Sequence, residues 1–506
     1  MKRINYVYLA LLLTASLLLT ACGSTNTTTG NEPMNNEQPQ VENNTGTNSQ
    51  APANEGVDAP VLEFELNDTF QNLLDEVNTA HEAVKISEAD YMPYVVQYEE
   101  PGFNINEYRY NPAAQKSEAT ILTLEQVAED MEVYYKALRT NYHCAYTYFG
   151  GDEAFRTAVD GVVADCALLE VITCGDVLDS MEKRFAFVKD AHFRFGGRRS
   201  GELMVPFFFR SVAYMKTENG YETADGKTVA SVDGYEDLNE LFKLSLTKEG
   251  ELVYYPVVLD GIPINSFSGL VKCTLEPLTV HYTDGSTETL RGEDYYKPNY
   301  RGSTATVVVR EEEDIPIIMA TKFKDDASGQ EFVQTAHDYR DRDILIVDLR
   351  YHNGGNVFVG QAWAEMYMGM TAFMHPVIAV KHGKQENYSY YNSHKDNEFV
   401  SLDNVRIVLT SKVASSAAEG FADICFNMEN TLFVGENTYG AYTSTASNQI
   451  SLPNSGLHMI FGNGLMLFDN DGHFEEYRGL VPDIWVPAME AEEAVMNFIA
   501  KNTTAN

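Results

Sequence analysis

The spacing of hydrophobic positions changes along the chain, and the changes mark out its segments. Residues 7–19 form a continuous apolar run that follows Lys2 and Arg3. Residues 22–58 are rich in Asn, Thr, Gln, Glu and Pro and contain no Lys, Arg or aromatic residue. Such a composition cannot bury enough apolar surface to fold, so we expect a disordered tether there. Residues 59–117 show no pattern that assigns them to a domain.

Helical spacing begins after Thr123. Thr123 and Gln126 have the spacing of a capping box, which predicts a helix start. Two apolar sets follow at intervals of three and four residues, as expected for one face of a helix. They are Leu124, Val127, Met131, Tyr135 and Leu138, and then Val177, Met181, Phe185 and Val188. Residues 118–200 are therefore predicted to form a small helical domain.

Short alternating segments replace the helical pattern over residues 201–303. One of them, residues 278–281, is followed by the turn pair Asp284-Gly285. Apolar and β-branched residues that alternate between turns are typical of strands. We therefore expect a β-rich insertion.

Strands and helices alternate from residue 304 onward. Residues 344–349 and 405–410 read as buried strands, and residues 431–434 as a third. Between the last two strands, apolar residues fit one helical face, namely Ala417, Phe421, Ile424 and Met428. The order of strand, turn, helix and strand predicts an α/β domain over residues 304–490. Residues 491–506 would add a C-terminal helix and tail.

The N-terminal apolar run predicts a signal peptide. It is shorter than the roughly 20 residues that cross a bilayer, and it ends in the lipobox Leu19-Thr20-Ala21-Cys22. We expect residues 1–21 to be removed and Cys22 to become the lipidated first residue. At about 0.8 kcal/mol per buried methylene, two or more acyl chains hold a protein on the membrane. This predicts a protein anchored to the cell membrane on its extracytoplasmic face.

Charge and cysteine content narrow the possible partners. The formal net charge of −38 argues against nucleic acid and against adsorption to anionic lipid, which both require Lys and Arg clusters. Membrane contact would therefore come from the anchor alone. Besides Cys22 there is an odd number of cysteines with no CxxC spacing, which indicates neither a disulfide framework nor a zinc site. The acidic run at 311–314 reads as a solvated loop, so we expect no metal.

Ser415 and Ser416 stand between the second buried strand and the predicted helix. A serine at this place is commonly a helix N-cap. It can also present its hydroxyl to a substrate carbonyl while nearby backbone N–H groups face the developing oxyanion. Both interpretations stay open on local grounds.

Four short segments change this picture when they are taken together. They are Asp348-Leu349-Arg350 with Gly354-Gly355, Ser415-Ser416-Ala417-Ala418-Glu419, Gly435 to Gly440, and Gly479-Leu480-Val481-Pro482-Asp483. In this order and spacing they resemble the tail-specific, or C-terminal-processing, serine peptidases, over residues 120–490. The resemblance implies an α/β core of the crotonase and Clp-protease type with a helical N-terminal domain and a β insertion. It also implies polypeptide substrates and no cofactor, and it leaves the oligomeric state open.

The resemblance assigns roles residue by residue. The Ser-x-x-Glu element places the nucleophile at Ser416, because Glu419 sets the frame and Ser415 is then its neighbour. The Asp-Leu-Arg element with its two glycines resembles the loop whose backbone N–H groups form the oxyanion hole. This implies an oxyanion hole made by Gly354, Gly355 and Ala417.

The expected base departs from the best-known branch of the family. That branch uses a lysine after Thr-x-Gly, where this chain has Ala441. A tricorn-like branch uses a His from the helical domain and a Glu shortly before the last motif, and His192 and Glu476 resemble these. The implied triad is Ser416, His192 and Glu476, in which Glu476 orients the imidazole.

Several alternatives accompany this assignment. Glu475 is a competing orienting group, and His352, on the oxyanion loop, is a competing base. Ala191 stands where tricorn-like enzymes tend to carry a serine. The missing lysine and Ala191 favour, as an alternative, a degenerate family member that binds peptides without cutting them. A lipobox and tether are also typical of solute-binding lipoproteins. Residues 229–234 resemble a PDZ module only weakly, which suggests a plain β cap.

Overall fold

The computed structural model describes residues 64–81, 90, 92–96, 98–300, 302, 304–369, 377–381, 384–388, 402–466 and 474–505. The chain forms two units, residues 1–62 and 63–506, and all described residues belong to the second. The predicted signal peptide, Cys22 and the tether lie outside the described residues. Within the ranges above, no helix combines the length and the apolar character of a membrane span.

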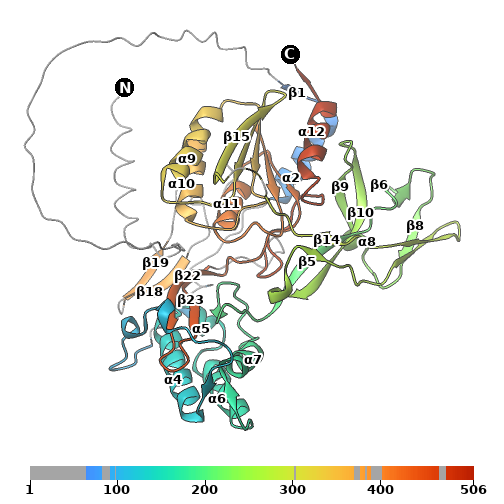
Figure 1. Ribbon diagram of the computed structural model, residues 1–506. Helices are drawn as coiled ribbons and strands as arrows, with labels where there is room; N and C mark the ends of the chain where they lie inside the picture. Colours follow the sequence, from blue (N-terminus) through green and yellow to red (C-terminus); the bar gives the residue numbers. More distant parts are fainter. Residues whose placement is uncertain are drawn as a thin grey trace, which may run out of the picture. The chain divides into compact units, whose positions relative to one another are not determined.

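A mixed sheet organises the C-terminal half of the chain (Figure 1). Its parallel part runs in the order β16 (Ile315–Ala320), β17 (Ile344–Asp348), β20 (Val405–Thr410), β21 (Thr431–Gly435), β24 (Ile484–Trp485) and β9 (Phe242–Leu246). All residues of β17, β20 and β21 are buried. A strand covered on both faces needs such an apolar run. The three buried strands predicted from the sequence are confirmed.

Helices cover both faces of this sheet. Leu345 and Val347 of β17 pack with α9 (Ala327–Tyr339), α10 (Val357–Met368) and α11 (Ala417–Phe426). Ile344 and Ile346 point to the other face, against α2 (Asp68–Ala80) and α12 (Ala491–Asn502). Alternate strand residues point to opposite faces, so one apolar run supports two helical layers. The helix α2 comes from the segment that the sequence pattern left unassigned, and β1 (Phe64–Leu66) pairs with β25 (Thr503–Ala505).

The β-rich insertion is continuous with the main sheet. Its strand β9 pairs with β24 through Trp485 and Ser245, and with the long strand β10 (Leu252–Pro263) on its other side. The strand β10 also pairs with β5 (Glu202–Phe208) and β6 (Tyr214–Thr217), and β6 with β7 (Gly220–Thr223). A separate three-stranded sheet holds β8 (Val229–Val232), β12 (Leu278–Tyr282) and β13 (Thr287–Leu290). The two-stranded pair of β11 (Leu270–Val271) and β14 (Tyr295–Tyr296) completes the region.

The helical domain contains α4 (Leu124–Asn141), α5 (Ala145–Tyr148), α6 (Gly151–Cys166) and α7 (Cys174–Arg184). The capping box predicted at Thr123 is confirmed at the start of α4. A hairpin of β22 (Ser444–Ser451) and β23 (His458–Met466) contributes Ile450, Met459 and Phe461 to the core of this domain. It also pairs with β4 (Arg194–Phe195). The hairpin thus brings residues near 444 beside those near 192.

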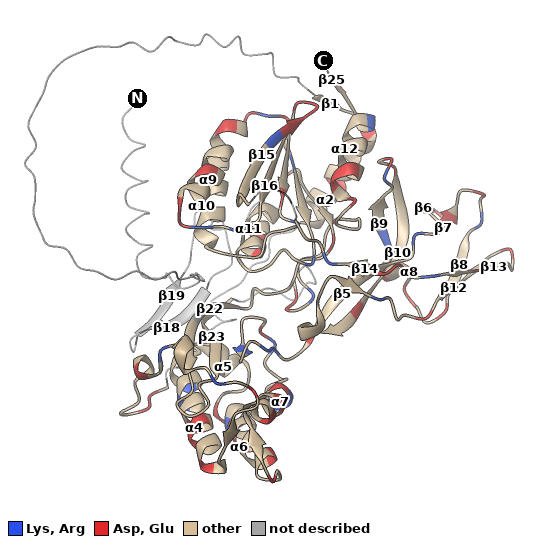
Figure 2. Ribbon diagram, viewed as in Figure 1, with Lys and Arg blue, Asp and Glu red and all other residues tan. Residues whose placement is uncertain are grey.

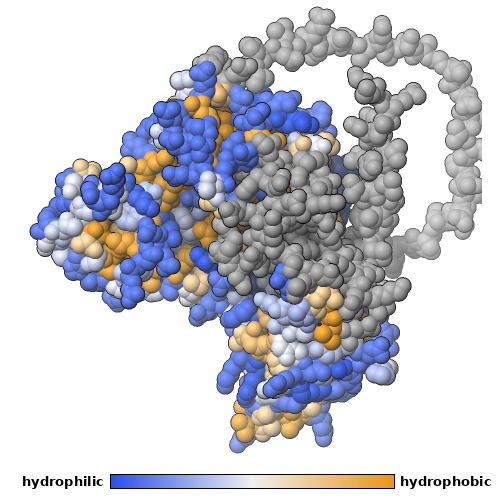
Figure 3. All heavy atoms as spheres, turned by 180° about the vertical axis from the view of Figure 1, so that it is seen from behind, coloured by the Kyte–Doolittle hydropathy of each residue, from blue (hydrophilic) through white to orange (hydrophobic). Residues whose placement is uncertain are grey.

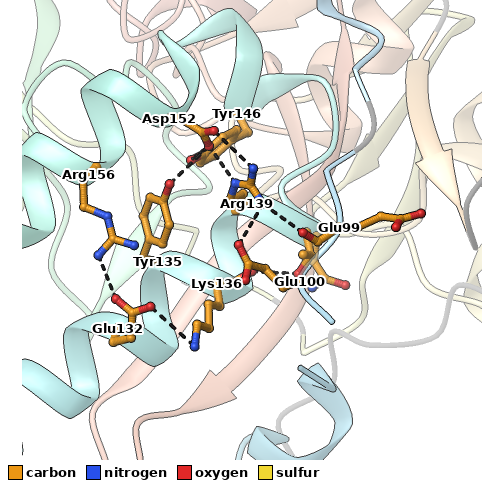
Figure 4. Close-up of polar contacts among 11 residues, drawn as sticks. Glu99, Glu100, Glu132, Tyr135, Lys136, Arg139, Tyr146, Asp152 and Arg156 are labelled. Carbon is orange, nitrogen blue, oxygen red and sulfur yellow. Dashed lines mark hydrogen bonds and ion pairs between the residues drawn. The ribbon is translucent and has the colours of Figure 1, made fainter. Parts of the chain in front are cut away.

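A polar network holds the helical domain to the segment before it (Figure 4). Arg139 of α4 donates to Asp152 of α6, at 2.7 Å, and to the Glu100 carboxylate, also at 2.7 Å. The hydroxyls of Tyr135 and Tyr146 donate to the same Asp152. These partly exposed bonds keep residues near 100 on the helices.

Acidic residues outnumber basic ones in the chain, 74 to 36. Figure 2 shows Asp and Glu along the helices of both regions, with Lys and Arg at scattered positions. Figure 3 shows apolar surface interspersed among polar residues. Among the exposed apolar side chains is Leu168, shortly after the end of α6, which is 85% exposed. The five cysteines of the described part are free thiols, and four of them are buried.

Candidate active site

Ser416 lies in a strained turn between β20 and α11. It occupies the N-cap position of the helix with φ 58° and ψ −113°. A residue with a side chain in this conformation costs on the order of 1–3 kcal/mol and persists only when its surroundings enforce it. A sharp strand-to-helix turn of this kind projects a hydroxyl away from the backbone toward a substrate. Ser415 beside it does not share the positive φ.

Glu419 enforces this turn. Its Oε2 accepts the backbone N–H of Ser416 at 2.8 Å and that of Ala441 at 2.9 Å. Its Oε1 accepts the Thr438 hydroxyl and the Gly440 N–H, both at 2.6 Å. Burial raises the pKa of this carboxyl, and the four donors oppose that shift. One buried side chain therefore joins the nucleophile turn to residues 438–441.

His192 reaches the same hydroxyl from the helical domain. Its Nε2 lies 3.1 Å from Ser416 Oγ, although 224 residues separate the two in sequence. The imidazole is buried, and burial lowers its pKa to about 4 while the neighbouring Asp190 opposes the change. The ring is therefore neutral at pH 7, and Nε2 can accept a proton from the hydroxyl.

The two glycines border the nucleophile closely. A Cβ on Gly354, at φ 101°, would lie 3.2 Å from Ser416 Cβ, and one on Gly355, at φ 135°, would lie 2.0 Å from the Phe323 carbonyl oxygen. The Gly354 N–H donates to His352 Nδ1 at 3.1 Å. In contrast, the N–H groups of Gly355 and Ala417 have no acceptor among the described residues. Uncommitted backbone N–H groups beside a hydroxyl are what an oxyanion requires.

Glu476 does not bond to the imidazole in this structure. Its Oε1 accepts the backbone N–H of Ala191 at 2.7 Å. Its Oε2 accepts the N–H groups of Tyr442 and Thr443, at 3.1 and 3.0 Å, and the Thr443 hydroxyl at 2.8 Å. Burial, with Asp190 nearby, raises the pKa of Glu476 to about 8. The carboxylate thus contacts the residue before His192, through the backbone.

Comparison with known proteins identifies the domain that carries Ser416. Residues 314–486 match the family model Peptidase family S41. These residues form an S41 peptidase domain. The protein is accordingly a serine-type peptidase of the tail-specific group, with polypeptide substrates. His192, in the helical domain, lies outside the matched residues.

Several solved structures resemble this chain at low sequence identity. A complex of mature CPAF with lactacystin is 12% identical, covers 75% of this chain and 97% of its own, and has a TM-score of 0.38. A peptidase structure from Parabacteroides merdae is 15% identical, with coverages of 74% and 96% and a TM-score of 0.37. The photosystem II D1 C-terminal processing protease is 13% identical, with coverages of 73% and 94% and a TM-score of 0.35. No curated protein matches the chain.

The competing residues of the S41 peptidase occupy different environments. Glu475 is 70% exposed on its side chain and lies 3.9 Å from Arg478. His352 is fully buried against Phe323, and burial lowers its pKa to about 3. Its Nδ1 accepts the Gly354 N–H, so this ring shapes the glycine loop.

Two residues of the site had no role in the sequence interpretation. Asp190 is fully buried and accepts the His192 backbone N–H at 2.8 Å. Lys412 is also fully buried, and its Nζ donates to the carbonyls of Thr438, Tyr477 and Arg478 at 2.7 to 2.9 Å. The only sequence signal for Lys412 is its position, because it and Arg406 are the two cations in the apolar stretch before Ser416. Over the described ranges, no group of three or more His, Cys, Asp or Glu residues forms a potential metal site.

Proposed function

We propose that this S41 peptidase is a lipid-anchored, extracytoplasmic endopeptidase that cleaves polypeptides through an acyl-enzyme on Ser416. The observation that carries the proposal is the 3.1 Å contact between Ser416 Oγ and His192 Nε2, made at a serine held with positive φ. A nucleophile and a neutral base within hydrogen-bond reach are the minimum machinery for acyl transfer.

The proposed reaction runs in two stages. Ser416 Oγ attacks the carbonyl carbon while its proton passes to His192 Nε2, and the N–H groups of Gly355 and Ala417 stabilise the oxyanion. Gly354 belongs to the same loop. Its N–H would complete the oxyanion hole if it no longer donated to His352 Nδ1. The imidazolium then gives its proton to the leaving amine, and water hydrolyses the ester by the reverse roles. Glu476 would be the third member of the Ser-His-Glu arrangement, acting through the Ala191 amide.

Labelling with a fluorophosphonate tests the nucleophile. The purified, processed protein should be labelled, Ser416→Ala should not, and Ser415→Ala should be labelled at a rate close to that of the wild type. Ser415→Ala is the matched control because it removes the same hydroxyl one residue away. Labelling that depends on Ser415 instead would show that Glu419 does not set the frame. A folded wild-type protein that never labels would favour a degenerate peptide-binding member or a solute-binding lipoprotein.

The membrane anchor rests on the lipobox that ends at Cys22, which lies outside the described residues. Cys22→Ser should block lipidation, and the protein should move from the detergent phase to the aqueous phase in Triton X-114 partitioning. Protease added to intact cells or spheroplasts should digest the wild-type protein, since the anchor places it on the outer face. Retention of Cys22→Ser in the detergent phase would contradict the anchor.

A further inference from the structure

The second ring nitrogen of His192 has no hydrogen bond. Its Nδ1 is buried and lacks a partner of hydrogen-bond geometry within the described residues, although the Ser444 backbone lies near enough to raise the pKa of the ring. For Nε2 to accept the proton of Ser416, the neutral ring must carry its own proton on Nδ1. A buried N–H without an acceptor costs about 1–3 kcal/mol. The reaction adds a positive charge to the same ring. An acceptor for the Nδ1–H hydrogen bond, preferably a negatively charged one, would therefore stabilise the imidazolium.

Asp190 is the carboxylate nearest to that nitrogen. Its Oδ1 lies 3.9 Å from His192 Nδ1 and accepts the His192 backbone N–H at 2.8 Å. Its Oδ2 accepts the hydroxyls of Tyr142, at 2.6 Å, and Ser444, at 2.5 Å. Asp190 is fully buried, and among the described residues it pairs with no Lys or Arg. Buried charges are normally paired, so the protonated form of His192 is its natural counter-ion.

Glu476 is less suited to this role. Its two oxygens already accept four hydrogen bonds, from Ala191, Tyr442 and Thr443. The contact nearest to the base ends on the Ala191 backbone N–H, and the Ala191 side chain is a methyl group that cannot relay a hydrogen bond. Glu476 can therefore fix the chain beside His192 without meeting the ring.

We propose that Asp190 is the residue that positions His192 and stabilises its cation, and that Glu476 acts one step further away by holding the Ala191 amide. The inference rests on the proposed function.

As Ser416 Oγ bonds to the carbonyl carbon, its proton moves to Nε2 and the carbonyl electron pair moves to the oxygen. Nδ1 keeps its proton throughout and closes on Asp190 Oδ1. The distance shortens from 3.9 Å to the roughly 2.8 Å of a charge-assisted bond. Catalytic hydrogen bonds are often long before substrate binds. When the leaving amine takes the Nε2 proton, the C–N bond breaks and the ring becomes neutral again.

Other charged groups also act on His192. Arg194 and Arg199 lower its pKa, whereas Asp190 raises it. Glu476 lies close enough to Asp190 for the two carboxyls to repel each other. Asp190→Asn removes the group that favours the imidazolium and leaves both arginines in place. Asp190→Asn should therefore lower the pKa of His192.

The test compares Asp190→Asn, Asp190→Glu, Ser444→Ala and Glu476→Gln in the processed, detergent-solubilised protein. The rates measured are peptide cleavage and fluorophosphonate labelling as functions of pH. Asp190→Asn should lower kcat by about 100-fold or more with KM within about threefold, and its acid limb should move to lower pH. Ser444→Ala removes one donor to the carboxylate but keeps its charge. Its acid limb should move to higher pH, because Asp190 then attracts the imidazolium more strongly. Asp190→Glu carries the same charge as the wild type, so its acid limb should lie closer to that of the wild type than the acid limb of Asp190→Asn does.

The outcomes separate this inference from the proposed function. A wild-type protein that neither labels nor cleaves overturns both. If the wild type labels and folded Asp190→Asn keeps its kcat and acid limb, only the inference fails. It also fails if Glu476→Gln moves the limb further than Asp190→Asn does. If Asp190→Asn does not fold, Ser444→Ala still tests the inference. An acid limb of its pH profile that stays in place or moves to lower pH would overturn the role of Asp190.

Discussion

Activity at acidic pH is the sharpest consequence of the burial of His192. For a histidine with a carboxylate beside its ring, the reference value leads us to expect a pKa near 6.5 or slightly above it. The structure changes this expectation, since burial lowers the pKa of His192 to about 4. The reactive form is the neutral imidazole, so kcat/KM should fall only as the pH drops through this lower pKa.

The size of the effect follows from the shift. A change from 6.5 to about 4 corresponds to about 3 kcal/mol between the two protonation states. At pH 5.5 a base with a pKa near 4 is almost entirely neutral, whereas one with a pKa of 6.5 is only about one-tenth neutral. The two cases therefore differ about tenfold in kcat/KM at pH 5.5, relative to the value at pH 8.

The same shift affects stability and must be separated from catalysis. The folded-state pKa of His192 lies below its unfolded value, so the unfolded state binds a proton first as the pH falls. This contribution to stability is complete above pH 6.5 and is lost as the pH falls from 6.5 through about 4, by up to about 3 kcal/mol. His352, whose pKa burial lowers to about 3, adds to this loss in the same direction.

The assay is cleavage of a fluorogenic peptide between pH 3.5 and 9 at constant ionic strength. Near-UV circular dichroism at each pH and recovery of activity at pH 7.5 show whether the protein remains folded. His337→Gln is a suitable control, because this histidine has a side chain 66% exposed and should leave the profile unchanged. An acid limb at pH 6 or above in folded protein would refute the argument that burial controls the base.

Three further perturbations test how the site is held. Glu419→Gln replaces one acceptor oxygen by an NH₂ group that faces backbone donors, and we expect a loss of about 3 kcal/mol in urea unfolding with a large loss of labelling. Gly355→Ala forces a Cβ to within 2.0 Å of the Phe323 carbonyl oxygen, so this variant should be strongly destabilised. In Gly354→Ala the nearest contact of the new Cβ is 3.2 Å, so this variant should lose labelling more than stability. Lys412→Met leaves three buried carbonyls without their donor and should lower the unfolding free energy by about 3 kcal/mol, measured by the same urea titration.

Local patterns predicted those parts of the fold that depend on neighbours in sequence. The capping box at Thr123 and the buried strand β17 are encoded within a few residues, by side-chain identity and by an unbroken apolar run. The frame of the nucleophile was predictable for the same reason, since Glu419 accepts the N–H of a residue only three positions earlier. The contact of Ser416 with His192 was predictable only through the family resemblance.

Long-range packing could not be read in this way. The helix α2 has an ordinary amphipathic pattern, and nothing in it indicates that Phe70 packs on a sheet whose strands β17, β20 and β21 come more than 270 residues later. The hairpin β22–β23 likewise gives no local sign that it enters the core of the helical domain. Its placement matters for the site, because it carries Ser444 to the Asp190 carboxylate.

Lys412 helps to explain why a histidine is the more suitable base in this chain. Ala441 stands at the position of the family lysine, and its N–H is bound to Glu419. The cation that the site does contain, Lys412, directs its Nζ to three carbonyl oxygens. Burial lowers the pKa of this lysine, but an ammonium group that donates to three acceptors has no lone pair to receive a proton from Ser416. Releasing that lone pair would leave one of these buried carbonyls without a donor, whereas His192 presents Nε2 to the hydroxyl while keeping a proton on Nδ1. The lysine can therefore hold the carbonyls of Thr438 and Tyr477 in place, and proton transfer falls to the imidazole.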